Sequence, residues 1–285
     1  MYGYAAKSLC LLGGKILYTG VREITLSYEE LSDFYNGDLK TDLLLNEYLL
    51  IKNKDGDIVD KYKKEKDGVT KLKYKSFDSQ LLGKIKPRNQ RQEILMDLLC
   101  SEAKLLSISG VAGAGKTFLT TAHAIQELQK EKYKKIVIIR NNVSIQDVPE
   151  LGILPGDATE KLKNSCAFMG DIITDFFFDS FLRDGKIEIV YLGNMRSRSI
   201  SDSYILCNES QNLTTNLVKM IITRVGENSR LVFDFDLSQI DKKSFEKDNG
   251  MLAMNEALKG NELFGACELD LIERSEVAKL AGLIN

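Results

Sequence analysis

The spacing of hydrophobic and polar residues divides the chain near residue 85. Up to that point, short runs alternate apolar and polar side chains between turn signals, as in residues 15–27, which is typical of half-buried strands. Residues 28–38 (YEELSDFYNGD) predict a helical turn closed by Asn-Gly, and residues 46–63 predict two strands around a Lys-Asp-Gly turn. Alternation at residues 71–75 (KLKYK) predicts a strand with three lysines on one face. We therefore predict a small β-rich N-terminal module over residues 1–85.

From residue 86 onward, predicted strands alternate with predicted helices. Apolar residues at helical spacing predict helices over residues 88–100, 116–130 and 214–224. Short apolar runs predict strands at residues 105–109, 135–140, 186–192, 204–207, 230–235 and 267–272. Short buried strands between longer helices are typical of a mostly parallel sheet with helices on both faces. The fold class predicted for residues 86–285 is therefore α/β.

Composition and charge narrow the class of protein. The chain has 285 residues, of which 44% are hydrophobic, so it can bury a substantial core. No run approaches the roughly 18 apolar residues that span a bilayer, and the N-terminus does not resemble a signal peptide. Five single cysteines with no CxxC pair indicate reduced thiols, so we expect a cytoplasmic protein without a membrane partner. The single histidine, His123, argues against a histidine triad, and we expect it to be a packed or surface residue of a helix.

Residues 110–117 (GVAGAGKT) match the phosphate-binding pattern G-x-x-x-x-G-K-[ST] at every fixed position. A predicted strand precedes the pattern and a predicted helix follows it, and this context argues against a chance match in a glycine-rich turn. The glycines allow backbone N–H groups to surround an anion, and the helix N-terminus adds a favourable partial charge. Lys116 is expected to contact the β- and γ-phosphates, and Thr117 to offer its hydroxyl to Mg²⁺.

Two later strands end in residues suited to nucleotide chemistry. In YILCNES, Asn208 stands where P-loop hydrolases place an aspartate, so we expect nucleotide binding to persist while Mg²⁺ affinity and turnover fall. Glu209 follows and is a candidate general base, with an ordinary strand-end acid as the alternative. In RLVFDFDLSQID, Asp236 and Gln239 are candidates for sensing the γ-phosphate. Asp234 shares a face with Asp236; we interpret it as a solvated acid, with a role at the metal as the alternative.

The order and spacing of several segments resemble the PhoH-like ATPases. The segments are PRNQRQ (87–92), GVAGAGKT (110–117), IIRNNV (138–143), LGILPGDATEK (151–161), MRSRSISDSYI (195–205), NESQNLT (208–214), ITRVGENSRLV (222–232), DLSQID (236–241) and ERSEVAKLA (273–281). LYTGVREITLSYEEL and NEYLLIK are also similar to the region that joins a PIN ribonuclease domain to the ATPase in two-domain members. Because no PIN domain precedes them here, we expect a separately encoded nuclease as a partner, and a compact genome such as that of a phage.

The resemblance implies a RecA-like core, ATP and Mg²⁺ as cofactors, ATPase activity, action on RNA as a helicase, and a homo-oligomer such as a ring of six. By position, the implied nucleotide-binding residues are Gln92, Gly110, Val111, Ala112, Gly113, Ala114, Gly115, Lys116, Thr117 and Phe118. The implied metal-site residues are Thr117, Asn208 and Asp236, and the implied catalytic residues are Lys116, Arg198, Glu209, Gln239 and Arg274.

Two departures from the family pattern matter. Where the family has Asp-Glu-Ala-Gln-Asn, this chain has NESQN at residues 208–212. Where the family has Gly-Asp, this chain has Phe235-Asp236. We expect Phe235 to place a bulky ring where the backbone normally passes close to phosphate. Arg198 and Arg274 match characteristic family arginines, and in a ring either is a candidate arginine finger for a neighbour's γ-phosphate. For the matching Arg196 and Arg224, function and surface ion pairing stay open alternatives.

The sequence leaves the function open between an enzyme and a binding protein. The first reading is an ATP-driven motor that remodels RNA. A lysine face at Lys71, Lys73 and Lys75, with Tyr62 and Tyr74 nearby, would suit an RNA backbone, and a solvated charged face is the alternative. The second reading is a scaffold that oligomerises around nucleotide, hydrolyses little of it and recruits a nuclease. A small-molecule kinase is a third reading, without an identifiable acceptor site.

Overall fold

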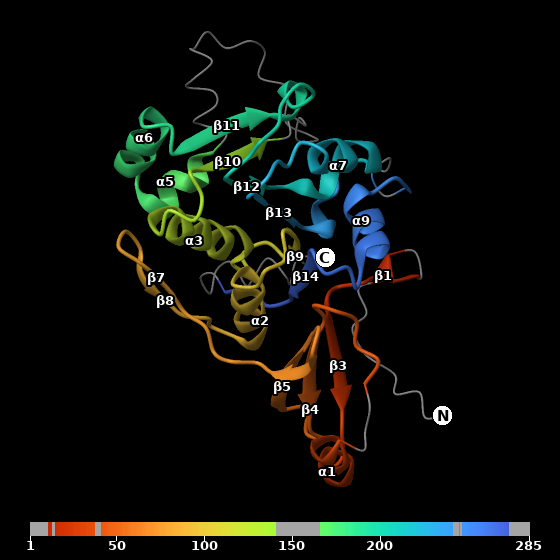
Figure 1. Cartoon of the computed structure of the whole chain (residues 1–285). Coiled ribbons are helices and arrows are strands. Elements are labelled where there is room, and N and C mark those ends of the chain that lie inside the picture. Colours follow the sequence, from red (N-terminus) through yellow and green to blue (C-terminus); the bar gives the residue numbers. More distant parts are fainter. Residues whose placement is uncertain are drawn as a thin grey trace.

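A six-stranded sheet forms the centre of the molecule (Figure 1). The computed structural model describes residues 11–12, 15–37, 41–140, 166–241, 245 and 247–273. The strands follow the order β11-β10-β12-β13-β9-β14, and every neighbouring pair is parallel. Their bounds are β9 Leu105–Gly110, β10 Lys135–Arg140, β11 Ile187–Tyr191, β12 Ser203–Cys207, β13 Arg230–Phe235 and β14 Phe264–Leu269. The predicted α/β class with a parallel sheet is confirmed.

Helices cover both faces of this sheet, as its buried strands require. One face packs against α2 (Gln90–Leu99), α3 (Lys116–Gln129), α5 (Ala167–Ile173) and α6 (Asp175–Arg183), and the other against α7 (Thr215–Ile222) and α9 (Gly250–Leu258). Strand alternation divides the core accordingly, since Val232 packs on the α3 side and Phe233 on the α7 side. Short 3₁₀ turns are η1 (Leu192–Asn194), η2 (Ser210–Asn212) and η3 (Leu237–Gln239).

The N-terminal residues form a second, smaller sheet of order β3-β4-β5-β6. Its elements are β3 (Val21–Thr25), α1 (Tyr28–Asn36), β4 (Tyr48–Lys52), β5 (Ile58–Glu65) and β6 (Gly68–Lys71), with β3 and β4 parallel and the other pairs antiparallel. A capping box of Ser27 and Glu30 begins α1, and Gly37, at φ +83°, ends it at the predicted Asn-Gly. The predicted hairpin of β4 and β5 is confirmed.

Two short antiparallel pairs complete the N-terminal region. They are β1 (Leu11–Leu12) with β2 (Lys15–Ile16), and β7 (Phe77–Ser79) with β8 (Gly83–Ile85). The second pair lies along α3, where the side chain of Gln126 accepts a hydrogen bond from the backbone of Asp78 over 2.7 Å. The predicted strand at residues 71–75 is wrong, because β6 ends at Lys71 and the chain then leaves the small sheet.

The small sheet packs directly against α2 of the main domain. Tyr48 and Leu50 belong to the same buried cluster as Ile94, and the Tyr48 hydroxyl donates to Asp97 over 2.9 Å. Arg91 of α2 forms an ion pair with Glu23 at 2.7 Å. The small sheet therefore shares packing with the main domain, and the boundary of residues 1–85 as a separate domain stays a prediction.

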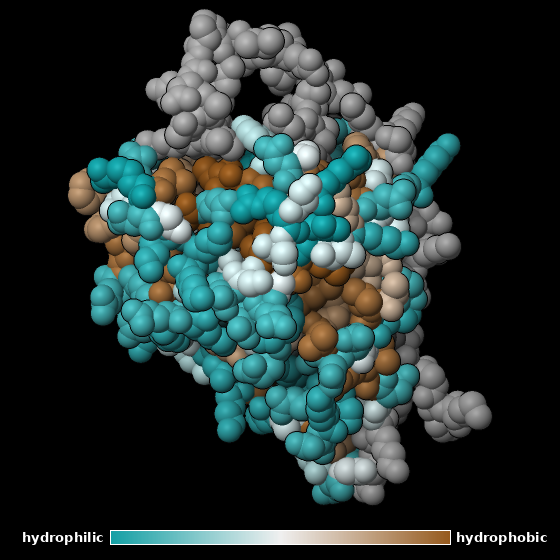
Figure 2. Space-filling model, turned by 45° about the horizontal axis from the view of Figure 1, so that its top comes forward, coloured by the Kyte–Doolittle hydropathy of each residue, from teal (hydrophilic) through white to brown (hydrophobic). Residues whose placement is uncertain are grey.

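The surface of the main domain is mostly hydrophilic in the view of Figure 2, with brown, hydrophobic surface at its left edge, where α6 lies in Figure 1. On α6, Phe176 is 72% exposed and Phe177 is 40% exposed. None of the helices that the structure describes is long and apolar enough to cross a membrane.

Candidate functional site

The glycine-rich loop joins the end of β9 to the start of α3, at the carboxyl edge of the parallel sheet. Gly113 and Gly115 have φ of +82° and +94°, which glycine adopts at little cost. Gly110, at φ +140°, has no room for a side chain, because a Cβ there would lie 2.1 Å from the carbonyl oxygen of Leu269. The predicted phosphate-binding residues, from Gly110 to Thr117, thus form a strand–loop–helix, and the N-terminus of α3 offers a favourable partial charge to an anion.

Lys116 is folded over this loop. Its Nζ donates to the carbonyl oxygens of Gly110 at 2.7 Å and Val111 at 3.0 Å, and the residue is only 9% exposed. The loop therefore holds the ammonium group at the place where the β- and γ-phosphates of a nucleotide are expected.

Gln92 of α2 forms a hydrogen bond with the backbone of the loop. Its Nε2 donates to the carbonyl oxygen of Ala114 over 3.0 Å, and its Oε1 accepts from the backbone N–H of Arg88 over 2.9 Å. Because both ends of this buried amide bond to backbone, Gln92 is placed to position the loop. It was predicted as a nucleotide-binding residue, and it lines the pocket beside the loop, so that role stays a prediction.

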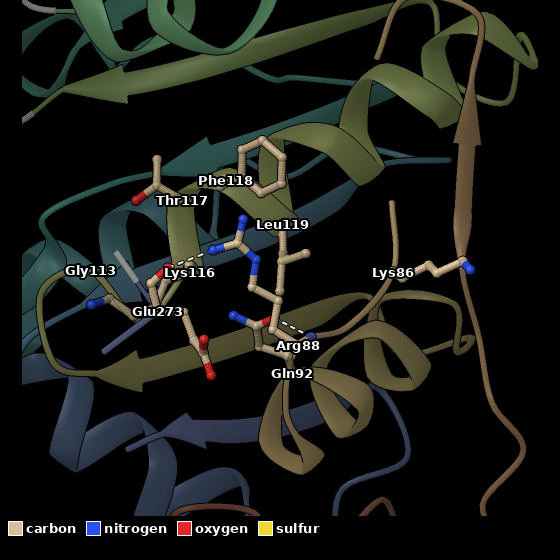
Figure 3. Close-up of a pocket in the computed structure, with 10 residues that line it drawn as sticks. Lys86, Arg88, Gln92, Gly113, Lys116, Thr117, Phe118, Leu119 and Glu273 are labelled. Carbon is tan, nitrogen blue, oxygen red and sulfur yellow. Dashed lines mark hydrogen bonds between the residues drawn. The ribbon is translucent and has the colours of Figure 1, made fainter. Parts of the chain in front are cut away.

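A pocket opens beside the loop, between α2 and α3 (Figure 3). It is lined by Lys86, Arg88, Gln92, Gly113, Gly115, Lys116, Thr117, Phe118, Leu119 and Glu273. Phe118 is 43% exposed, so it is a candidate for stacking on a ligand ring. The sequence did not single out Arg88 or Glu273. The backbone N–H of Glu273 donates to the carbonyl oxygen of Gly113 over 3.0 Å, and Arg88 Nη1 donates to the carbonyl oxygen of Glu273 over 2.7 Å.

Asp234 is the carboxylate that contacts the P-loop. It lies at the end of β13, between β12 and β9, and accepts a hydrogen bond from the Thr117 hydroxyl over 3.0 Å. Asn208 Nδ2 donates to the same carboxylate oxygen over 2.7 Å, and the backbone N–H of Glu209 donates to the other oxygen over 3.2 Å. Asp234 is 4% exposed, so our interpretation of it as a solvated acid is wrong. Burial and, after it, the Glu209 charge raise the pKa of its carboxyl.

The Asp236 carboxylate bonds to the turn that follows it in the sequence, η3. It accepts from the backbone N–H of Ser238 at 3.0 Å and from Gln239 Nε2 at 3.1 Å, so it caps η3. The two predicted sensor residues, Asp236 and Gln239, are thus in contact with each other. Among the described contacts, Thr117 bonds to Asp234 and not to Asp236, although Asp236 was the predicted metal-site residue.

Glu209 stands exposed at the carboxyl end of β12. Its backbone has a φ of +56°, which is uncommon for a residue with a side chain and is a feature of functional turns. Gln211 Nε2 donates to the Glu209 carboxylate over 2.9 Å, while Gln211 Oε1 accepts from the backbone N–H of Asp236 over 3.3 Å. Gln211, which the sequence did not single out, therefore links the candidate base to the next strand.

Phe235 does not occupy the phosphate side of the sheet. Its ring is buried with the cluster under α7 and α9, on the face opposite to α3. Because side chains alternate along β13, the flanking Asp234 faces the P-loop while Phe235 faces away. The expectation that this ring would crowd a phosphate is therefore wrong.

The described candidate arginines lie at the amino edge of the sheet, away from the P-loop of the same chain: Arg196 and Arg198 precede β12, and Arg224 precedes β13. Arg198 Nη2 forms an ion pair with Glu188 Oε1 at 2.5 Å, and Arg224 Nη1 donates to the carbonyl oxygen of Arg196 over 2.8 Å. An action on nucleotide would thus require another subunit, and the arginine finger stays a prediction. Arg274 lies outside the described residues.

The lysines near the small sheet are partly neutralised. Lys71 forms an ion pair with Asp60, and the Tyr62 hydroxyl donates to the same carboxylate over 3.5 Å. Lys73 and Tyr74 are exposed. RNA binding on this surface stays a prediction.

The residues present fit a magnesium ion held mainly by nucleotide. Among the described residues, no three His, Cys, Asp or Glu side chains gather into a metal-binding group. Mg²⁺ prefers one or two protein oxygens together with phosphate and water, and the Thr117 hydroxyl and the Asp234 carboxylate lie together at this edge of the sheet. Asn208 Oδ1 is buried and has no hydrogen-bond partner in the described part of the chain, so it has an unused acceptor beside the Thr117–Asp234 pair. A metal-bound water would satisfy it.

Comparison with known proteins places this site in a family. The family model for "PhoH-like protein" matches residues 84–282. The chain is 33% identical to Protein PhoH2 of Bacillus subtilis (strain 168), over 93% of this chain and 64% of that protein. It is 30% identical to Protein PhoH2 of Mycolicibacterium smegmatis, over 71% of this chain and 47% of that protein. It is 34% identical to the PhoH-like protein of Bacillus subtilis, over 60% of this chain and 55% of that protein.

The chain thus spans less than two thirds of the length of these relatives. The family match covers the whole sheet that carries the P-loop, Asp234 and Glu209. On this evidence the chain belongs to the PhoH-like proteins, a family of P-loop proteins that bind ATP.

Proposed function

We propose that this protein binds ATP together with Mg²⁺ and hydrolyses it in order to remodel RNA. The observation that carries the proposal is the position of Glu209, an exposed carboxylate held by Gln211 at the same sheet edge as the P-loop. A base in this position can take a proton from a water that attacks the γ-phosphate.

The chain's own residues divide the work of binding and orientation. Lys116 and the loop amides bind the phosphates. Phe118 and Arg88 line the pocket in which we place the adenine ring of the nucleotide. Thr117, Asn208 and Asp234 would hold the magnesium ion, which neutralises charge on the β- and γ-phosphates when bound. Gln239, fixed by Asp236, is oriented to respond to the γ-phosphate.

RNA and a second copy of the chain are the proposed partners. The exposed Lys73 and Tyr74 pair a charge for the backbone with a ring for stacking. Since Arg198 lies at the edge of the sheet opposite to its own P-loop, a ring of subunits is the arrangement that would let it serve a neighbour's nucleotide. The exposed Phe176 and Phe177 on α6 offer apolar surface for assembly.

Phosphate release, with and without single-stranded RNA, tests the proposal. We expect RNA to stimulate release by the wild-type protein. We expect Glu209→Gln to reduce release about 100-fold or more while ATP binding is retained, because the amide cannot accept the proton. The matched control is Glu227→Gln, an exposed glutamate before β13 at the amino edge of the sheet. Unchanged release in Glu209→Gln would exclude Glu209 as the base.

A second candidate function is a scaffold that assembles around nucleotide and recruits a separate nuclease. The neutral Asn208, at the position of the family's aspartate, favours it. The scaffold predicts a nucleotide-dependent increase in oligomer mass, measured by light scattering, without phosphate release at any RNA concentration. RNA-stimulated release would instead select the enzyme.

A further inference from the structure

The charge that Asn208 lacks is present on the neighbouring strand. The family has an aspartate at the position of Asn208, and an aspartate there would bring the negative charge from β12. In this chain β13, which lies between β12 and the P-loop strand β9, has Asp234 as its last residue but one. Its carboxylate accepts from both the P-loop hydroxyl of Thr117 and the amide of Asn208, at 3.0 and 2.7 Å.

We infer that Asp234 is the anionic residue of the magnesium site, in the role for which the family uses the aspartate at position 208. This inference rests on the proposed binding of ATP with Mg²⁺, but not on hydrolysis or on RNA.

The other acids nearby are engaged elsewhere. Asp236 caps η3 through Ser238 and Gln239, and the Glu209 carboxylate is exposed and bonded to Gln211. Among the described side chains, Asp234 is therefore the acid bonded to the Thr117 hydroxyl. A hard divalent cation favours a carboxylate over an amide at this point.

A neutral side chain at position 208 is compatible with a charged Asp234 beside it. Two carboxylates 2.7 Å apart would repel each other, and one of them would keep its proton. The Asn208 amide instead donates to Asp234 and leaves its oxygen, Oδ1, buried and free to accept from a metal-bound water. Asn208 and Asp234 thus form a coupled pair in which the amide lies at the end of β12 and the acid lies on β13.

The test measures metal binding with a set of variants. The probe is Mn²⁺, titrated by electron paramagnetic resonance into protein saturated with a non-hydrolysable ATP analogue. We expect Asp234→Asn to weaken Mn²⁺ binding about 10- to 100-fold, within the range for residues that support a metal site. Asn208→Asp alone should also weaken it, whereas the exchange variant Asn208→Asp with Asp234→Asn should recover most of the wild-type affinity. Asp202→Asn, which changes an acid directly before β12 at the opposite edge of the sheet, is the control and should leave the affinity unchanged.

The outcomes separate this inference from the proposed function. Calorimetry of the analogue without metal, with a thermal melting curve for each variant, establishes that nucleotide binding and folding persist. If nucleotide binds but Asp234→Asn retains wild-type Mn²⁺ affinity, or if Asn208→Asp alone strengthens it, the inference is overturned while ATP binding stands. If Asp234→Asn does not fold, the exchange variant Asn208→Asp with Asp234→Asn tests the inference instead. Failure of the exchange variant to recover Mn²⁺ binding would contradict the coupled pair. A wild-type protein that binds no nucleotide would overturn both.

Discussion

Gln92 Nε2 donates a hydrogen bond to the carbonyl oxygen of Ala114 over 3.0 Å, which fixes the P-loop to the first helix of the main domain. Gln92 Oε1 accepts from the backbone of Arg88, so both ends of the side chain support backbone. The close approach also limits Gly115, where an added Cβ would lie 2.9 Å from Gln92 Nε2. The loop's shape therefore depends on a residue outside the phosphate-binding motif.

Replacement of this side chain by an apolar one of similar size tests its role. We expect Gln92→Leu to weaken the binding of ATP and of GTP by the same factor, about tenfold, because the hydrogen bond to the loop at Ala114 and the hydrogen bond to the backbone of Arg88 are both lost. Calorimetric titration with each nucleotide measures this. A loss of ATP affinity alone would instead mean that Gln92 recognises the adenine base.

The junction between the small sheet and β14 depends on Gly20. Its φ is +77°, and an added Cβ would lie 2.0 Å from the carbonyl oxygen of Ala266. Gly37 has a similar φ of +83° but no atom within 4 Å of such a Cβ, so it is a control for the backbone alone. We expect Gly20→Ala to lower the free energy of unfolding by about 1–3 kcal/mol more than Gly37→Ala does, since overpacking adds to backbone strain. Urea unfolding checks this, and equal losses in the two variants would contradict it.

His123 makes stability depend on pH. The residue is 2% exposed and its Nδ1 lies 3.0 Å from the Tyr204 hydroxyl, so of the two expected placements, packed or at the surface, the packed one is confirmed. Burial, reinforced by the nearby Arg230 charge, lowers its pKa to about 3 from the usual 6.5. Below pH 6.5 the unfolded chain binds a proton that the folded chain does not bind, so stability is full above pH 6.5 and falls as the pH drops towards 3.

The single histidine makes this effect measurable. Between pH 7.5 and pH 5 we expect the wild-type protein to lose about 2 kcal/mol of unfolding free energy relative to His123→Gln, which has no group that titrates at this position. Urea unfolding at a series of pH values gives the comparison. Parallel pH profiles for the two proteins would contradict the lowered pKa, because they would mean that His123 binds its proton equally in the folded and unfolded states.

The site features predicted correctly from the sequence are those that depend on residues close together along the chain. The P-loop was identified because its glycines, lysine and threonine are contiguous between a strand and a helix. The role of Asp234 depends on the strand order, which places β13 next to β9, and local patterns do not contain that order. The direction of Phe235 follows from the same placement.

Strand limits were less predictable for a similar reason. Residues 267–272 were predicted as the last strand, but β14 runs over Phe264–Leu269, where Gly265 and Ala266 have little preference for strands. Pairing with β9, from Leu105 to Gly110, extends the strand over them. The tie between Gln92 and Ala114 likewise joins elements whose packing only the fold reveals.

Calorimetric titration of the wild-type protein with a non-hydrolysable ATP analogue, in excess magnesium, is the most direct test of the central claim that the loop around Lys116 binds the phosphates of ATP. We predict saturable binding of one nucleotide per chain, and a loss of affinity of about 100-fold or more in Lys116→Ala, because a buried charge partner of the phosphates is removed. No heat of binding in the wild-type protein, or equal affinity in the Lys116→Ala variant, would contradict it.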